Sequence, residues 1–390
     1  MFDYIKNVKS NYVFRTVRKE KENYTLKSGL TPIDLSIGDY SAPIFKTVKK
    51  AYIKGVKEVA KAGAKFGYPP LDGYAFLKKK IAAEYAEKGA DISEDEIFIT
   101  DGAKNDLFRL AAVIGKGGVV LSEPAYPVYN DLSAFFGAEI SRVRAENCEG
   151  FIPVGDPFSG VENGAFYLCS PSNPTGAAYK KRDFERVISC AEKSGSVIIY
   201  DGAYSCFLNG NAFETLYNLS GAKSRVIEVH TLSKCARFTN LRLGFTVIPK
   251  EVKAFKSNYT RLLLSSFNGV SYPLSRAGES VFSKSGKKEV LKNVTEVKEK
   301  SACLIKKLKE VTPVCGGECS PYVYAKCPNG FSSIEFFKKL LYFAGVLGVP
   351  SSGFTFGEES GGEYIRFSAF AKKSDVISGA ERIVKTYLSL

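Results

Sequence analysis

The chain has 390 residues, of which 45% are hydrophobic and 25% are charged, and its formal net charge is +14. This length and apolar content predict a large core, in one large domain with a smaller one beside it. No apolar run approaches the roughly 18–20 residues of a membrane span, and the first residues lack the apolar stretch of a signal peptide, so we expect a cytoplasmic protein with no membrane partner.

Cysteine, histidine and lysine usage argue against several kinds of site. The nine cysteines include no C-x-x-C pair, and the closest two, Cys315 and Cys319, have no further Cys or His beside them. This pattern predicts reduced thiols and no metal site. A Ser-His-Asp or Cys-His mechanism would need the single histidine, His230, which we instead expect in a strand. The lysines are mixed with glutamates, as at 78–87, which favours a solvated surface over a nucleic-acid partner.

The first third of the chain alternates between strand and helix patterns. Residues 1–30 are polar and are interpreted as an N-terminal arm. The pattern then predicts a strand at 31–39, helices at 44–56 and 76–85 around a loop at 66–73, a strand at 96–100 and a helix at 105–114. The backbone N–H groups of Gly102, Ala103 and Lys104 would lie at the start of that last helix, where an anion binds readily.

The alternation continues to residue 272 and then stops. Further strands are predicted from 118 and at 166–169, 196–200, 224–229 and 243–248, with a helix at 181–193. This order predicts an α/β fold with a mostly parallel central sheet and helices on both faces. A charged helix at 284–310 and strands at 321–326 and 363–369 predict a smaller α+β domain. We expect an N-terminal arm with part of the small domain at 1–45, a large domain at 46–272 and a small domain at 273–390.

The segment from His230 to Gly244 contains a lysine among phosphate-binding groups. Lys234 follows Thr231 and Ser233, and Arg242 comes eight residues later. Such a lysine can form a Schiff base with the aldehyde of pyridoxal phosphate, while hydroxyls and a guanidinium hold the phosphate. The segment therefore predicts a pyridoxal-phosphate site.

Three polar residues upstream of Lys234 follow strand ends, where open α/β sheets bind ligands. Asn173 follows the strand at 166–169, and Asp201 and Tyr204 follow the strand at 196–200. An aspartate there can keep the pyridine nitrogen protonated, and Asn173 and Tyr204 can bond the ring's phenolic oxygen. Tyr126, after the strand that begins at 118, can stack on the ring.

In this order, Asn173, Asp201, Tyr204, Lys234 and Arg242 resemble the site of the fold-type-I pyridoxal-phosphate aminotransferases. Longer strings across nearly the whole chain look like the LL-diaminopimelate aminotransferases. These strings are Leu35–Asp39, Phe98–Lys104, Glu123–Tyr129, Leu241–Pro249, Phe267–Gly269 and Tyr364–Ala369.

The resemblance implies a role for each matched residue. Lys234, Asp201 and Tyr204 would be catalytic, and Arg366 would grip the substrate α-carboxylate. The implied cofactor-binding residues are Tyr68 (from a second subunit), Ala103, Lys104, Tyr126, Asn173, Asp201, Tyr204, Thr231, Ser233, Lys234 and Arg242. The implied substrate-binding residues are Tyr12, Gly38, Lys104, Tyr126, Asn173, Asn268 and Arg366, some of them across the interface of a homodimer.

Two positions depart from the family pattern. Thr231 stands where the family usually has serine, which keeps the hydroxyl. Leu71 stands where the family commonly has a glutamate credited with reading the distal end of the substrate. The second departure concerns the choice of substrate and leaves the chemistry intact.

The resemblance implies amino transfer between LL-2,6-diaminopimelate and 2-oxoglutarate, giving tetrahydrodipicolinate and glutamate, in lysine biosynthesis. Leu71 leaves open a class-I aminotransferase for an aromatic or aspartate-like substrate, which Lys104 and Asn268 disfavour. A β-eliminating (C–S) lyase on the same fold is a further alternative. A regulator built on this fold would need a DNA-binding domain, for which residues 1–30 are too short.

Overall fold

The computed structural model describes residues 12–40, 42–145, 150–356 and 362–390. Its centre is a seven-stranded sheet with the strand order β2-β8-β7-β6-β5-β3-β4. Only β8 runs antiparallel to its neighbours in this sheet. The strands are β2 (Ile97–Thr100), β3 (Gly118–Glu123), β4 (Glu139–Arg144), β5 (Ala165–Cys169), β6 (Val197–Asp201), β7 (Val226–Thr231) and β8 (Gly244–Val247).

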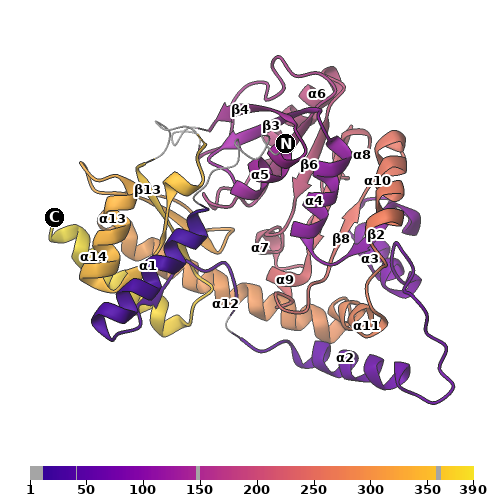
Figure 1. The fold of residues 1–390 in the computed structure, drawn as a ribbon, viewed down its shortest axis with the longest axis horizontal. Helices are drawn as coiled ribbons and strands as arrows, with labels where there is room; N and C mark the ends of the chain where they lie inside the picture. Colours follow the sequence, from indigo (N-terminus) through magenta and orange to yellow (C-terminus); the bar gives the residue numbers. More distant parts are fainter. Residues whose placement is uncertain (1–11, 41, 146–149, 357–361) are drawn as a thin grey trace, which may run out of the picture.

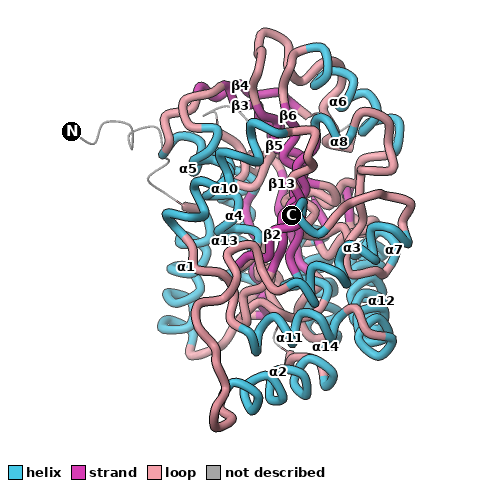
Figure 2. The backbone as a smooth tube through the Cα atoms, turned by 90° about the vertical axis from the view of Figure 1, so that its right-hand side faces the viewer, coloured by secondary structure: helices cyan, strands magenta, loops and turns pink. Residues whose placement is uncertain are grey.

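Helices cover both faces of this sheet (Figures 1 and 2), as the alternating pattern predicted. The central strands β5, β6 and β7 are buried except at Val197, the first residue of β6, which is what a sheet covered on both sides requires. The helices of this part are α2 (Lys46–Val59), α3 (Ala75–Glu87), α4 (Ala103–Ile114), α5 (Pro127–Phe135), α6 (Lys181–Lys193), α7 (Cys206–Asn209), α8 (Ala222–Arg225), α9 (Leu232–Cys235), α10 (Lys253–Ser266) and α11 (Tyr272–Val281).

A second, smaller part has its own hydrophobic core, on the side of the molecule that carries the C-terminus in Figure 1. It contains an antiparallel sheet in the order β12-β13-β10-β9 and a parallel pair of β1 with β11. Its elements are α1 (Val13–Ser28), β1 (Ile33–Asp34), β9 (Val314–Gly316), β10 (Tyr322–Lys326), α13 (Ser333–Lys339), β11 (Val346–Leu347), β12 (Val349–Pro350), β13 (Tyr364–Ser368) and α14 (Lys373–Leu388).

The long helix α12 (Lys284–Leu308) belongs to both cores. Val290 and Val294 pack in the core of the large sheet, whereas Leu304 and Leu308 pack in the second core. The helix therefore holds the two parts together, as Figure 1 shows. The domain limits placed after residues 45 and 272 stay a prediction.

The N-terminal segment differs from the sequence-based expectation. Within the predicted arm, to which no helix was assigned, residues 13–28 form α1, which buries Val13 and Val17 one turn apart and ends at Gly29 with φ of +70°. The strand expected over residues 31–39 is only Ile33–Asp34, because Gly38 and its neighbours turn towards the cavity described next.

Candidate active site

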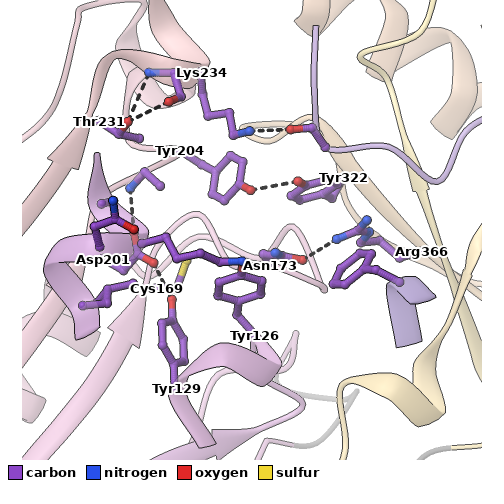
Figure 3. Close-up of a pocket in the computed structure, with 18 of the residues that line it drawn as sticks. Tyr126, Tyr129, Cys169, Asn173, Asp201, Tyr204, Thr231, Lys234, Tyr322 and Arg366 are labelled. Atoms are coloured by element: carbon purple, nitrogen blue, oxygen red, sulfur yellow. Dashed lines mark hydrogen bonds between the residues drawn. The ribbon is translucent and has the colours of Figure 1, made fainter. Parts of the chain in front are cut away.

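A cavity of about 630 Å³ lies where the carboxyl ends of β5, β6 and β7 meet the second part of the molecule. This is the edge at which open α/β sheets bind ligands. Figure 3 shows side chains from both parts pointing into it. The lining includes Tyr12, Gly38, Ala103, Lys104, Tyr126, Asn173, Asp201, Tyr204, Thr231, Ser233, Lys234, Arg242 and Arg366.

Lys234 projects from α9, directly after β7. The Thr231 hydroxyl caps this short helix by accepting the N–H of Ser233 at 3.2 Å. The Lys234 ammonium donates a hydrogen bond to the carbonyl oxygen of Gly38, from the opposite wall. Burial is the largest cause that lowers the pKa of Lys234 to about 8. The negative charge of Asp39 opposes this shift, whereas the positive charges of Arg242 and Arg366 add to it. A large fraction of this amine is therefore neutral near pH 8, as a nucleophile must be.

Positive groups gather beside Lys234 at the N-terminus of α4. The first N–H groups of this helix, at Ala103 and Lys104, have no acceptor within the helix. Arg242 reaches the Ser233 hydroxyl at 3.4 Å. Gly102 has φ of +107°, and a Cβ there would lie 2.6 Å from an Arg242 nitrogen. Burial and Arg242 lower the pKa of Lys104. Together these groups fit a phosphate dianion, and the glycine leaves room for the guanidinium.

A buried acid, Asp201, lies on the floor of the cavity and is 4% exposed. Its carboxylate accepts the hydroxyl of Tyr129 at 2.6 Å and the N–H of Ala203 at 3.1 Å. Burial raises the pKa of Asp201, whereas these two hydrogen bonds and the nearby His230 and Lys234 lower it. Such a carboxylate gains by pairing with a cationic ring nitrogen.

The opposite end of the cavity holds a buried cation, Arg366, which is 1% exposed. Its guanidinium donates to the Asn173 amide oxygen and to the Ser36 carbonyl oxygen, both at 2.7 Å. Its Nε has no hydrogen-bond partner among the residues that the structure describes. None of the ion pairs between those residues includes Arg366. A buried guanidinium without a counter-ion favours an incoming carboxylate.

These three features fit pyridoxal phosphate with an amino acid beside it. The positive groups around Arg242 suit the phosphate, Asp201 suits the ring nitrogen, and Lys234 lies between them and the guanidinium of Arg366. Tyr204 and Asn173 lie in the same cavity, within reach of a group held there.

Two predicted site residues lie outside the cavity of this single chain. Tyr68 is 87% exposed, and Asn268 is exposed on a separate loop. The two loops touch, since a Cβ on Gly269 would lie 2.5 Å from the carbonyl oxygen of Pro70. Both residues therefore belong to one surface. Leu71, in the first of these loops, packs against the main core.

The sequence interpretation gave no role to some residues that line the cavity. Cys169 ends β5 as Asp201 ends β6, so its position at a strand end could have identified it. Tyr129 and Tyr322 also line the cavity, together with Phe14. Tyr322 opens a strand of the smaller part, and no local pattern links it to the lysine segment.

His230 lies in a strand, as predicted, and the cysteines of the described ranges form no disulfide. His230 lies in β7, is buried, and contacts the Glu228 carboxylate at 3.1 Å. Cys315 and Cys319 are free thiols. In the described ranges no group of three or more Cys, His, Asp or Glu side chains could hold a metal ion, and no helix there could cross a membrane.

A family model described as "Aminotransferase class I and II" matches residues 31–382. The chain is 35% identical to an LL-diaminopimelate aminotransferase of Lachnospira eligens, over 96% of both chains. It is 34% identical to the enzyme of the same name from Agathobacter rectalis, over 98% of both chains. Among solved structures, the L,L-diaminopimelate aminotransferase of Chlamydomonas reinhardtii superposes with a TM-score of 0.89 and 27% identity, over 99% of this chain and 98% of that one.

Proposed function

The chain belongs to the family of class I and II aminotransferases, and from this premise we propose that it transfers the amino group between LL-2,6-diaminopimelate and 2-oxoglutarate. Relatives that are 33–35% identical to it over nearly their whole length are named LL-diaminopimelate aminotransferase. As in the rest of the family, the cofactor is pyridoxal phosphate. The physiological direction would form diaminopimelate from tetrahydrodipicolinate and glutamate, in the cytoplasm, for lysine biosynthesis.

One observation carries the proposal: a buried guanidinium, which has no counter-ion among the described residues, lines the same cavity as a lysine of lowered pKa. An α-amino acid bound by its carboxylate at Arg366 brings its amino group and Cα towards Lys234. The chemistry of amino transfer needs both groups at that point.

Each residue has a separate duty in this reaction. Pyridoxal phosphate supplies an aldehyde that condenses with amines and a protonated ring that accepts electrons from Cα. Lys234 would hold the cofactor through its amine, and that amine, once free, would move the proton of the substrate Cα. Asp201 would keep the ring nitrogen protonated. Tyr204 and Asn173 would bind the phenolic oxygen, and Tyr126 would stack on the ring.

The phosphate would be held by groups that leave the rest of the cavity to the substrate. Ser233, Arg242 and the start of α4 surround it, with Thr231 beside them. Tyr68 would join them from a second subunit, so we propose a homodimer with shared active sites. The exposure of Tyr68 and Asn268 on touching loops supports this arrangement.

The distal end of diaminopimelate carries a carboxylate and an ammonium. Lys104 supplies a cation for the carboxylate, and Asn268 of the second subunit supplies an amide. Tyr12 and Gly38 complete the substrate wall. Leu71 offers nothing to the ammonium, so Asp72 or carbonyl groups of the same loop serve it. A site with polar partners for a group strongly rejects an analogue that lacks that group. Since Leu71 removes one such partner, we expect this enzyme to discriminate less between the stereoisomers of diaminopimelate than relatives that have a glutamate.

A panel of amino donors tests the proposed function. Purified protein loaded with cofactor is mixed with 2-oxoglutarate and one donor at a time, and glutamate is measured. We expect LL-diaminopimelate to be used in preference to tyrosine and aspartate. Preference for tyrosine or aspartate would limit the assignment to the family, and pyruvate with ammonia in place of glutamate would indicate the lyase.

A further inference from the structure

Tyr322 opens β10 in the smaller part and is 1% exposed. Its ring and its hydroxyl contact different parts of the cavity (Figure 3). We propose that Tyr322 is a positioning residue of the aminotransferase site, which aligns the carboxylate-binding Arg366 through its ring and the phenol of Tyr204 through its hydroxyl. This inference rests on the proposed function.

The ring of Tyr322 supports the buried guanidinium. The Arg366 Cζ atom lies 4.3 Å from the ring centroid, closer than the rings of Phe354 at 5.2 Å and Phe14 at 5.3 Å. Since a desolvated cation over an aromatic face is attracted by it, this ring helps to keep the guanidinium in place before a carboxylate arrives. Tyr322 and Arg366 are on paired strands, with Tyr324 opposite Arg366 in the register.

The hydroxyl of Tyr322 is hydrogen-bonded to that of Tyr204 at 2.8 Å. Burial, followed by the proximity of Tyr322, holds the pKa of Tyr204 well above its usual range, so Tyr204 stays a neutral phenol. A neutral phenol can donate only one hydrogen bond. Tyr322 therefore helps to decide whether that proton points towards the cofactor oxygen or away from it.

Gly38 reveals how closely this hydroxyl is held. A Cβ on Gly38 would lie 2.3 Å from the Tyr322 hydroxyl oxygen and no nearer than 3.5 Å to any other atom of that side chain. The carbonyl oxygen of Gly38 in turn accepts a hydrogen bond from Lys234. The hydroxyl thus lies between the Gly38 turn and the Tyr204 phenol, on a ring whose face contacts the Arg366 guanidinium.

Two substitutions separate the ring from the hydroxyl. Tyr322→Phe keeps the ring and should leave the affinity for L-glutamate within about twofold. It should shift the pH midpoint of the cofactor's visible absorbance by about half a pH unit or more, since an ordinary hydrogen bond is lost. Tyr322→Leu also removes the aromatic face, and should weaken L-glutamate binding by about tenfold, which corresponds to about 1.4 kcal/mol.

Tyr324→Phe is the matched control, because Tyr324 is equally buried on the same strand but stacks on Tyr364 outside the cavity. It should change neither the spectrum nor the affinity. A second test uses the short distance between a Cβ on Gly38 and the Tyr322 hydroxyl. Gly38→Ala alone should slow the half-reaction with L-glutamate by about tenfold or more, whereas in the Tyr322→Phe background it should add less than about twofold, because the clashing oxygen is gone.

Equal effects of the phenylalanine and leucine variants at 322, or no difference from Tyr324→Phe, would overturn the proposal. So would a Gly38→Ala effect that is the same in both backgrounds. Thermal unfolding of every variant shows whether it still folds. If Tyr322→Leu does not fold, the comparison of Gly38→Ala in the wild-type and Tyr322→Phe backgrounds decides the question. Wild-type protein that shows no cofactor band would instead reject the proposed function itself.

Discussion

Replacing Tyr129 by phenylalanine should slow amino transfer without unfolding the protein. The lost hydroxyl is one of only two donors to the buried Asp201 within the described part of the chain, at 2.6 Å. A hydrogen bond to a charged group is worth about 1.5–3 kcal/mol. Its loss raises the pKa of Asp201 further, so the proton shared with the ring nitrogen lies more often on the carboxylate. If the whole loss is expressed in the barrier, the rate falls by about 10- to 150-fold.

Stopped-flow absorbance of the half-reaction with L-glutamate measures this rate. Tyr167→Phe is the matched control, because the Tyr167 ring stacks on that of Tyr129 at 5.0 Å and is equally buried. We expect the control to react like wild type. Equal rates for the two variants would refute the view that Tyr129 acts through the Asp201 carboxylate.

Three further predictions concern the lysine and the phosphate groups. The rate at which cofactor-free protein captures pyridoxal phosphate should rise with pH around a midpoint near 8, because Lys234 must be neutral and its pKa is lowered to about 8; a midpoint above pH 10 would contradict this. Gly102→Ala should raise the dissociation constant of the cofactor by about tenfold, measured by fluorescence titration, because alanine is strained at φ of +107° and would crowd Arg242. Lys104→Ala should lower the rate with diaminopimelate more than with glutamate, and equal losses would assign Lys104 to the phosphate alone.

Local pattern was sufficient for every strand of the large sheet except β4, whose residues are largely exposed, and for one side of the cavity. Asn173 and Lys234 follow strands of the covered sheet and Asp201 ends another, and parallel strands bring such positions to one edge. Sequence order therefore translated directly into proximity. The start of α4, which also lines the cavity, was predicted in the same way, from Gly102 just after a strand.

The features of the site that were not predicted from the sequence depend on contacts between distant segments. Tyr322 reaches Tyr204 only because the smaller part packs over the strand ends, and nothing near residue 322 signals this. Helix α1 was missed because its apolar stripe is short, with Val13 and Val17 buried among charged neighbours. The positions of Tyr68 and Asn268 relative to the cavity depend on a second subunit, which periodicity does not describe.

The most direct test of the proposed reaction follows the nitrogen itself. Purified protein with pyridoxal phosphate is given LL-diaminopimelate labelled with ¹⁵N at its amino groups, together with unlabelled 2-oxoglutarate, and the products are analysed by mass spectrometry. The proposal predicts ¹⁵N-labelled glutamate, formed by wild type and not by Lys234→Ala. Release of the ¹⁵N as ammonium, with no labelled glutamate, would contradict the proposal. So would labelled glutamate formed by the Lys234→Ala variant.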